Sequence, residues 1–290
     1  MTITLLDGSI GQELVKRLGA QPTPLWSTRV MLDRPDLVED IHRDYFRVGA
    51  DIATLNSYPL LHNRLDNNGI GEQFELLHTT AREIAARART AHGSGRIAAS
   101  LGPLGASYRP DLAPSVPEAA EEYAEIVALH DDEVDLHLIE TASGLRLAEG
   151  ALAGCAAAMK PVWLAMSVSD DDGTVLRSGE PLAEVLPLVD RYAPAALLIN
   201  CSTPEAVSQG LAVIKDHGVP FGAYANGFTK ISDAFKVVNQ VVDDLQSRTD
   251  LGPAAYANFV EGWVEMGATI VGGCCEVGPD HIAELKRRFG

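Results

Sequence analysis

Three cysteines of this 290-residue sequence stand where a short apolar run stops. Cys201 follows the run 196–200, and the adjacent Cys274 and Cys275 follow the run 269–273. Such runs are typical of buried strands, so we expect the thiols at strand ends. Three thiolates that converge there would form a Zn²⁺ site with one position left for a substrate. Three small buried apolar side chains, or a disulfide between neighbours, are the alternatives that the residues leave open.

A zinc ion held by thiolates favours chemistry at sulfur. Soft thiolate surroundings suit another sulfur ligand. A substrate thiol that binds the metal loses its proton, and the thiolate is the nucleophilic form of a group whose ordinary pKa is ~8.5. The cysteines therefore indicate S-alkylation of a substrate thiol. A zinc hydrolase would use His and carboxylate ligands instead, and no His ends a predicted strand.

Short apolar runs alternate with longer segments of helical periodicity along the sequence. The predicted strands are Ile3–Leu6, Asp51–Leu55, Arg96–Leu101, Leu136–Glu140, Val162–Val168, Ala196–Asn200, Phe221–Ala225 and Thr269–Gly272. The predicted helices are Asp36–Val48, Glu72–Ala91, Pro117–His130, Leu145–Ala158, Pro181–Tyr192, Pro204–His217, Pro253–Met266 and Pro279–Phe289. This alternation predicts an α/β fold, a (β/α)₈ TIM barrel that residues 1–290 form as one domain. An open doubly wound sheet is the alternative, but the sequence lacks its phosphate-binding glycine loop.

The chemistry of such a barrel lies at the carboxyl ends of its strands. The residues at these ends include two carboxylates, Asp7 and Glu140, and the phenol of Tyr58. A charge at a strand end has few structural explanations, so we expect both carboxylates to have a function. Gly272-Gly273, before the cysteine pair, predicts a flexible turn that lets both thiols reach one metal ion. The acidic segment 170–173 has no later Glu at calcium-loop spacing and is predicted to be a solvated loop.

The composition argues against several classes of protein. The sequence is 46% hydrophobic, but no apolar run reaches the ~18 residues of a membrane span. A net charge of −17, from 40 acidic and 23 basic residues, disfavours nucleic acid and anionic membranes as partners. Four cysteines are too few for a disulfide scaffold, and the N-terminus does not resemble a signal peptide. We therefore expect a cytoplasmic protein.

Three motifs follow one another along the chain, namely Asp7-Gly8-Ser9-Ile10-Gly11, Asn200-Cys201 and Gly272-Gly273-Cys274-Cys275. They resemble the Asp-Gly-x-x-Gly, Asn-Cys and Gly-Gly-Cys-Cys motifs of the zinc-dependent homocysteine S-methyltransferases, which are (β/α)₈ barrels. This family includes enzymes that use betaine or S-methylmethionine and the homocysteine-binding domain of methionine synthase. The resemblance covers essentially the whole chain, and its last two motifs are the specific ones.

The resemblance implies a role for each matching residue. The implied Zn²⁺ ligands are Cys201, Cys274 and Cys275. The implied substrate-binding residues are Asp7, Gly8, Ser9, Trp26, Tyr58, Glu140 and Asn200. Among these, Asp7 and Tyr58 are the catalytic candidates, and Glu140 matches an acid that receives the homocysteine ammonium group. Trp26 and Tyr58 match aromatic residues near the transferred methyl group.

The activity implied by the resemblance is methyl transfer to the thiol of homocysteine, which forms methionine. The expected donor is a small onium compound, namely S-methylmethionine, S-adenosylmethionine, dimethylsulfoniopropionate or betaine. One alternative is the homocysteine-activating subunit of a split cobalamin-dependent methionine synthase, with a cobalamin-carrying protein as its partner. Another is a zinc-binding and thiol-binding protein without turnover. The sequence is also compatible with a homo-oligomer.

Three positions on the expected active face depart from the pattern of the family, namely Gln12, Phe228 and Glu276. These departures leave the zinc–thiol chemistry intact. They bear on the identity of the methyl donor and of the acceptor.

Overall fold

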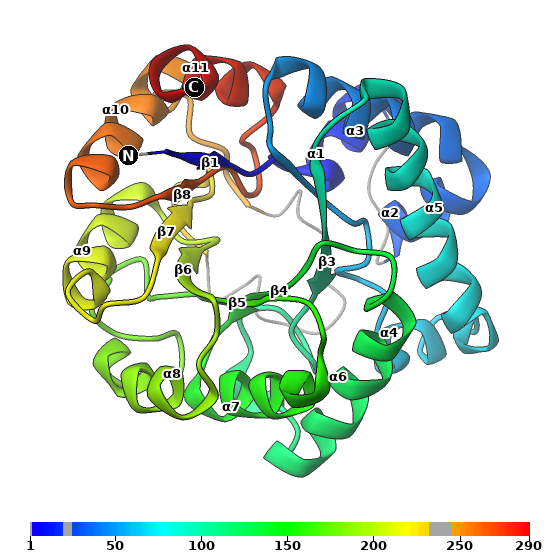
Figure 1. Cartoon of the computed structure of the whole chain (residues 1–290), viewed down its shortest axis with the longest axis horizontal. Helices are drawn as coiled ribbons and strands as arrows, with labels where there is room; N and C mark the ends of the chain where they lie inside the picture. Colours follow the sequence, from blue (N-terminus) through cyan, green and yellow to red (C-terminus); the bar gives the residue numbers. More distant parts are fainter. Residues whose placement is uncertain (1, 20–24, 232–244) are drawn as a thin grey trace.

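Parallel strands close into a barrel at the centre of the molecule (Figure 1). The computed structural model describes residues 2–19, 25–231 and 245–290. The strands are β1 (Thr4–Leu5), β2 (Ile52–Thr54), β3 (Arg96–Leu101), β4 (Leu136–Ala142), β5 (Val162–Met166), β6 (Ala196–Asn200), β7 (Phe221–Tyr224) and β8 (Ile270–Val271). They form one 8-stranded sheet of order β1-β8-β7-β6-β5-β4-β3-β2. A parallel bridge from Leu6 to Ile52 joins its two ends, which confirms the predicted TIM barrel.

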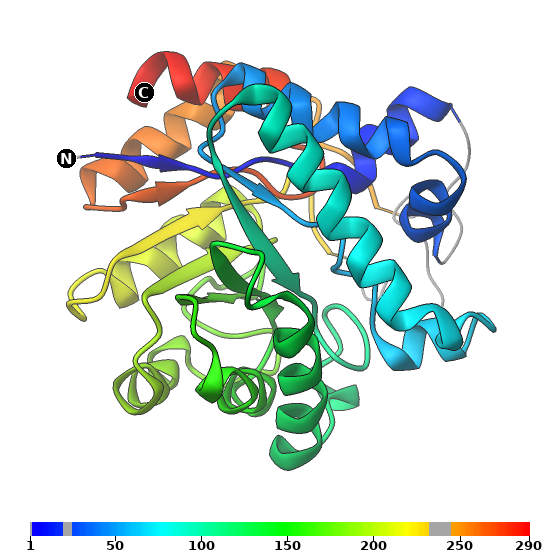
Figure 2. The same cartoon turned by 45° about the vertical axis from the view of Figure 1, so that its right-hand side comes forward.

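Helices surround the strands as an outer layer (Figure 2). They are α1 (Ile10–Leu18), α2 (Trp26–Asp33), α3 (Pro35–Val48), α4 (His62–Asp66), α5 (Phe74–His92), α6 (Val116–His130), α7 (Leu145–Gly154), α8 (Leu186–Tyr192), α9 (Pro204–Ile214), α10 (Pro253–Glu265) and α11 (Pro279–Phe289). Four 3-10 helices are η1 (Gly71–Gln73), η2 (Pro110–Leu112), η3 (Cys155–Ala157) and η4 (Leu182–Val185). None of the helices in the described ranges combines the length and apolar composition that a membrane span requires.

Helix α1 follows the first strand directly and was not predicted. Its start is encoded by Ser9, whose Oγ accepts a hydrogen bond from the backbone N–H of Gln12 over 3.1 Å. Its end is encoded by Gly19, which adopts a φ of 61°. Ile10, Leu14 and Leu18 have helical spacing, but the helix is short, and the buried polar residues Gln12 and Glu13 interrupt its inward face.

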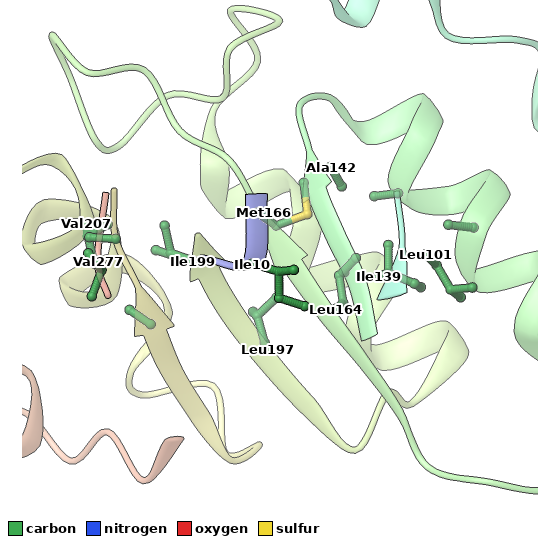
Figure 3. Packing of buried hydrophobic residues seen from close by; sticks show 14 of the residues in the cluster. Ile10, Leu101, Ile139, Ala142, Leu164, Met166, Leu197, Ile199, Val207 and Val277 are labelled. Atoms are coloured by element: carbon green, nitrogen blue, oxygen red, sulfur yellow. The ribbon is translucent and has the colours of Figure 1, made fainter. Parts of the chain in front are cut away.

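Alternate residues of β6 enter two separate apolar clusters. Leu197 and Ile199 of β6 belong to the cluster between strands and helices, where they lie beside Leu164 of β5 (Figure 3). Leu198, between them, belongs to the cluster inside the barrel, together with Trp163. This alternation follows from the two-residue period of a strand. Because the strands are parallel, their carboxyl ends meet on one face, and the chemistry-bearing loops gather there.

Candidate metal and substrate site

The three cysteines at the strand ends meet at one point. The Sγ atoms of Cys201, Cys274 and Cys275 all lie within 4.8 Å of one another. Cys201 Sγ and Cys275 Sγ are 3.8 Å apart. Cys201 is buried, whereas Cys274 and Cys275 are partly exposed, and all three line one cavity. Three sulfur atoms at this spacing can hold a metal ion.

Positive φ angles at other residues, rather than the two glycines, turn the chain beside the thiols. Cys201 has a φ of 49°, and Glu276, which follows the cysteine pair, has a φ of 65°. Gly272 and Gly273 do not adopt positive φ. A Cβ on Gly273 would lie 2.1 Å from Cγ1 of Val277. Both thiols of the pair therefore reach one point without positive φ at the two glycines, and the structure requires glycine at position 273 because a neighbouring side chain fills the space.

The donor set fits a soft metal ion. Hydrogen bonds from the thiols of Cys274 and Cys275 hold the pKa of Cys201 well below its ordinary range. Their interaction with Cys201 raises the pKa of each of the other two thiols. A cation would therefore meet one thiol that favours the thiolate form, and its binding would displace the remaining protons.

A tyrosine that sequence reasoning missed supports the cluster. The hydroxyl of Tyr108 donates a hydrogen bond to Cys201 Sγ over 3.1 Å. Tyr108 is buried and has a φ of 61°, which is uncommon for a residue with a bulky side chain. Neither the position of Tyr108 after the third strand nor its neighbours match a motif, so only the geometry reveals the contact.

A buried ion pair holds this tyrosine in place. The guanidinium Cζ of Arg177 lies 4.7 Å from the centroid of the Tyr108 ring. Arg177 pairs with Asp170 at 3.1 Å, and their side chains are 5% and 2% exposed. Asp170 also accepts hydrogen bonds from the backbone N–H groups of Thr203 and Ile231. The prediction of a solvated loop is therefore wrong for Asp170, whose carboxylate ties three loops together.

The thiols lie in the wall of a cavity of about 290 Å³ at the mouth of the barrel. A volume of this size suits small molecules of amino-acid dimensions. The predicted site residues in its wall are Asp7, Gly8, Ser9, Tyr58, Glu140, Cys201, Cys274 and Cys275. The structure thus brings together the residues that the sequence placed at the ends of β1, β2, β4, β6 and β8.

Asp7 lies at the end of β1 and is almost fully buried. Its carboxylate accepts hydrogen bonds from the backbone N–H of Thr54 over 2.7 Å and from Thr54 Oγ1 over 2.8 Å. Burial raises the pKa of Asp7 to about 8, although the two hydrogen bonds oppose this rise. Asp7 is thus a carboxyl that can exchange its proton near neutral pH.

Glu140 lies in β4, where its side chain faces the cavity. Its carboxylate accepts hydrogen bonds from the hydroxyl of Ser100 and, over 3.0 Å, from the hydroxyl of Tyr224. Burial raises the pKa of Glu140 to about 7, against the effect of these two hydrogen bonds. A cation bound beside Glu140 would favour the ionised form.

Tyr58 lines the cavity, whereas Asn200 does not. The Tyr58 hydroxyl lies 2.8 Å from Ser107 Oγ, and its side chain is part of the cavity wall. Asn200 is fully buried behind the wall. Its amide accepts a hydrogen bond from the backbone N–H of Thr141 and donates one to Thr141 Oγ1, both over 3.0 Å. Asn200 therefore positions Thr141, which lines the cavity with a φ of 59°.

The three departures from the family pattern lie around the thiols. The side-chain amide of Gln12 donates a hydrogen bond to the carboxylate of Glu276. Phe228 is buried and packs with Cys201, Tyr108 and other apolar residues.

The predicted site residue Trp26 begins α2, and its side chain lies outside the part of the chain that the structure describes.

Comparison with known proteins identifies one family. The homocysteine S-methyltransferase family matches residues 4–289. A homocysteine S-methyltransferase of Escherichia coli (strain K12) is 31% identical over 308 residues, which cover 99% of this chain and 95% of the relative. The methionine synthase of Mycobacterium leprae (strain TN) is 28% identical over 269 residues, which cover 87% of this chain but 21% of that protein.

The fold agrees with the sequence match. The crystal structure of the homocysteine methyltransferase MmuM from Escherichia coli, in its metallated form, superposes with a TM-score of 0.83 at 28% identity. The superposition covers 99% of this chain and 96% of that one. Because the family matches nearly the whole barrel, including both cysteine motifs, the chain belongs to the homocysteine S-methyltransferase family.

Proposed function

We propose that this protein transfers a methyl group from a small onium donor to the thiol of homocysteine and so forms methionine. One observation carries the proposal: a single cavity holds three thiols and two carboxylates, Asp7 and Glu140. We propose further that residues 1–290 act as one homocysteine-binding domain. Its compartment is the cytoplasm, where free thiols stay reduced.

We assign Zn²⁺ as the metal ion of Cys201, Cys274 and Cys275. Three thiolates leave one position of a tetrahedral zinc ion for a further ligand. When bound, zinc would supply the charge that lets the thiol of homocysteine ionise at neutral pH. A soft donor set of this kind favours sulfur over water as that further ligand.

The carboxylates of the cavity suit the amino-acid part of homocysteine. We assign Glu140 to the substrate ammonium, because a charge-assisted hydrogen bond to a buried carboxylate is strong. Asp7, with Gly8 and Ser9 of the same loop, lies in the cavity wall and is assigned to the amino-acid moiety. The ammonium would also favour ionisation of whichever carboxyl it contacts.

Methyl transfer then needs no covalent intermediate with the protein. The thiolate sulfur of homocysteine attacks the methyl carbon from the side opposite the leaving group. Sulfur supplies the electron pair of the new S–CH₃ bond, and the pair of the broken bond leaves with the donor, which becomes a neutral sulfide or amine. The ring of Tyr58 lies in the same cavity and can stabilise the onium charge by ~0.5–2 kcal/mol. Trp26 is assigned a similar aromatic role.

The similarity to part of methionine synthase favours a second candidate function. In that case the chain would activate homocysteine for methyl transfer from cobalamin on a partner protein. A zinc-binding protein without turnover is less consistent with the cavity, because it would not need Asp7 and Glu140 beside the thiols.

A donor screen tests the proposal. Zinc-loaded protein and homocysteine are incubated with each onium donor or with methylcobalamin, and methionine is measured by mass spectrometry. We expect turnover with an onium compound, and its loss in Cys274→Ser. Cys155→Ser is the matched control, because Cys155 is buried in η3 and does not line the cavity. Turnover with methylcobalamin alone would support the second candidate and contradict the first.

A further inference from the structure

Arg64 brings a positive charge into the cavity wall. It lies in α4, which follows the loop after β2, and its side chain lines the cavity. Its Nη2 donates a hydrogen bond to Ser107 Oγ over 3.3 Å, and its Cζ lies 5.5 Å from the centroid of the Tyr58 ring. Within the described ranges, Arg64 is the only lysine or arginine of the cavity wall.

Among the described residues, no carboxylate forms an ion pair with the guanidinium of Arg64. The two carboxylates of the cavity have other partners, since Asp7 binds Thr54 and Glu140 binds Ser100 and Tyr224. The guanidinium of Arg177, which stacks on the Tyr108 ring, is by contrast neutralised by its ion pair with Asp170. Arg64 keeps hydrogen-bond donors that Ser107 alone does not use, because a guanidinium has five N–H groups.

Arg64 is connected to the thiols through a short series of contacts. Ser107 Oγ lies within hydrogen-bond distance of both Arg64 and the Tyr58 hydroxyl. The next residue in the chain, Tyr108, donates to Cys201 Sγ. Arg64 and the three thiols also line the same cavity, so one small molecule can have one end beside Arg64 and the other beside the sulfur cluster.

An onium donor alone would conflict with Arg64, because two positive charges would share a cavity of low polarity. A donor that carries its own carboxylate removes the conflict, since arginine binds a carboxylate with two parallel hydrogen bonds. We infer, on the basis of the function proposed above, that Arg64 binds the carboxylate of the methyl donor. The donor class is therefore an onium compound with a carboxylate a few bonds from the charged centre.

A matched pair of donors tests this inference. Dimethylsulfoniopropionate and dimethylpropylsulfonium carry the same sulfonium centre, but only the first has a carboxylate. Steady-state rates are measured with both donors in the wild-type protein, in Arg64→Gln and in Arg64→Lys. The control is Arg29→Gln, which changes an exposed arginine of α2 outside the cavity wall.

We expect the wild-type protein to prefer the carboxylate donor in kcat/KM. Arg64→Gln lowers kcat/KM for that donor about 10–100-fold, as expected for a lost hydrogen-bonded charge pair. In Arg64→Gln, the rate with dimethylpropylsulfonium stays the same or rises, and the KM for homocysteine is unchanged. Arg64→Lys recovers part of the preference for the carboxylate donor. An equal loss with both donors, or a higher KM for homocysteine in place of the donor effect, would overturn the inference while the proposed function stands.

Inactivity of the wild-type protein with every onium donor would contradict the proposed function instead. In that case, binding measurements without turnover test whether Arg64 holds a carboxylate. Calorimetry on protein loaded with zinc and homocysteine compares the affinities of the two sulfonium compounds. Tighter binding of dimethylsulfoniopropionate that is lost in Arg64→Gln supports the site, and equal affinities overturn it.

Discussion

The hydroxyl of Tyr108 donates a hydrogen bond to Sγ of Cys201 over 3.1 Å. This contact joins the loop after β3 to the end of β6, and it is closed off from solvent because both side chains are buried. The donor lowers the electron density on one sulfur of a cluster in which three thiolates would share a cation. Tyr108 would thus position Cys201 for the proposed metal site.

Tyr108→Phe should weaken zinc binding about tenfold, because loss of an outer-shell partner commonly costs that much in metal affinity. Competition with a chromophoric chelator measures the change. Tyr192→Phe is the control, since the Tyr192 hydroxyl contacts Glu149 on the outer helices. Unchanged zinc affinity in Tyr108→Phe would show that the hydrogen bond has no role in holding the metal.

Gly8→Ala should destabilise the protein by ~1–3 kcal/mol. A Cβ at position 8 would lie 2.2 Å from the carbonyl oxygen of Val277, a backbone atom that cannot easily move away. Gly11→Ala, at the second residue of α1, places its Cβ where no atom lies within 4 Å and should be neutral or stabilising by up to ~1 kcal/mol. Urea unfolding compares the two variants, and equal effects would contradict the packing argument.

The two buried carboxyls should make the chelator-treated protein less stable as pH rises. Their pKa values increase on folding, from 3.8 to about 8 for Asp7 and from 4.5 to about 7 for Glu140. The folded state then binds more protons than the unfolded state between these values, so the free energy of unfolding falls as pH rises through this window. Each group lowers the free energy of unfolding by at most ~1.4 kcal/mol per pH unit in this window.

Glu140→Gln should therefore lose less stability than the wild type between about pH 5 and about pH 7. Urea titrations at a series of pH values measure the slopes. Glu184→Gln, which changes an exposed residue of η4, should keep the wild-type slope. If Glu140→Gln and the wild type lost stability in parallel, Glu140 would not titrate in this window.

Asn200→Ala should destabilise the protein by ~2–3 kcal/mol, because it removes both side-chain hydrogen bonds to Thr141 in a buried site. It also removes the support for the positive φ of Thr141. Asn258→Ala, at an exposed site where the amide accepts from Arg288, should cost less than ~0.5 kcal/mol. Thermal unfolding compares the two, and a small effect of Asn200→Ala would contradict its positioning role.

Periodicity in the sequence was sufficient to predict the barrel. The buried strands β3 and β6 have the predicted bounds, Arg96–Leu101 and Ala196–Asn200. The predicted helix 181–192 instead begins as η4 and continues as α8. Helix α4 was missed because five residues are too few for a periodic pattern.

The sequence also predicted which residues would gather at the mouth, because parallel strands bring their carboxyl ends together. It could not predict Tyr108, Arg177 or Arg64. These side chains reach the site from loops and from a short helix, and contacts of this kind leave no period or motif in the sequence. The close packing around Gly273 could not be predicted for a related reason, since the space around a residue depends on its neighbours in the fold.

X-ray absorption at the zinc edge tests the central claim most directly. Zinc-loaded protein is measured without and with homocysteine. We predict a first shell with the three sulfur atoms of Cys201, Cys274 and Cys275, to which homocysteine adds one further sulfur in exchange for an oxygen or nitrogen ligand. A spectrum that does not change when homocysteine binds, or a first shell dominated by nitrogen and oxygen, would contradict activation of the substrate thiol at this site.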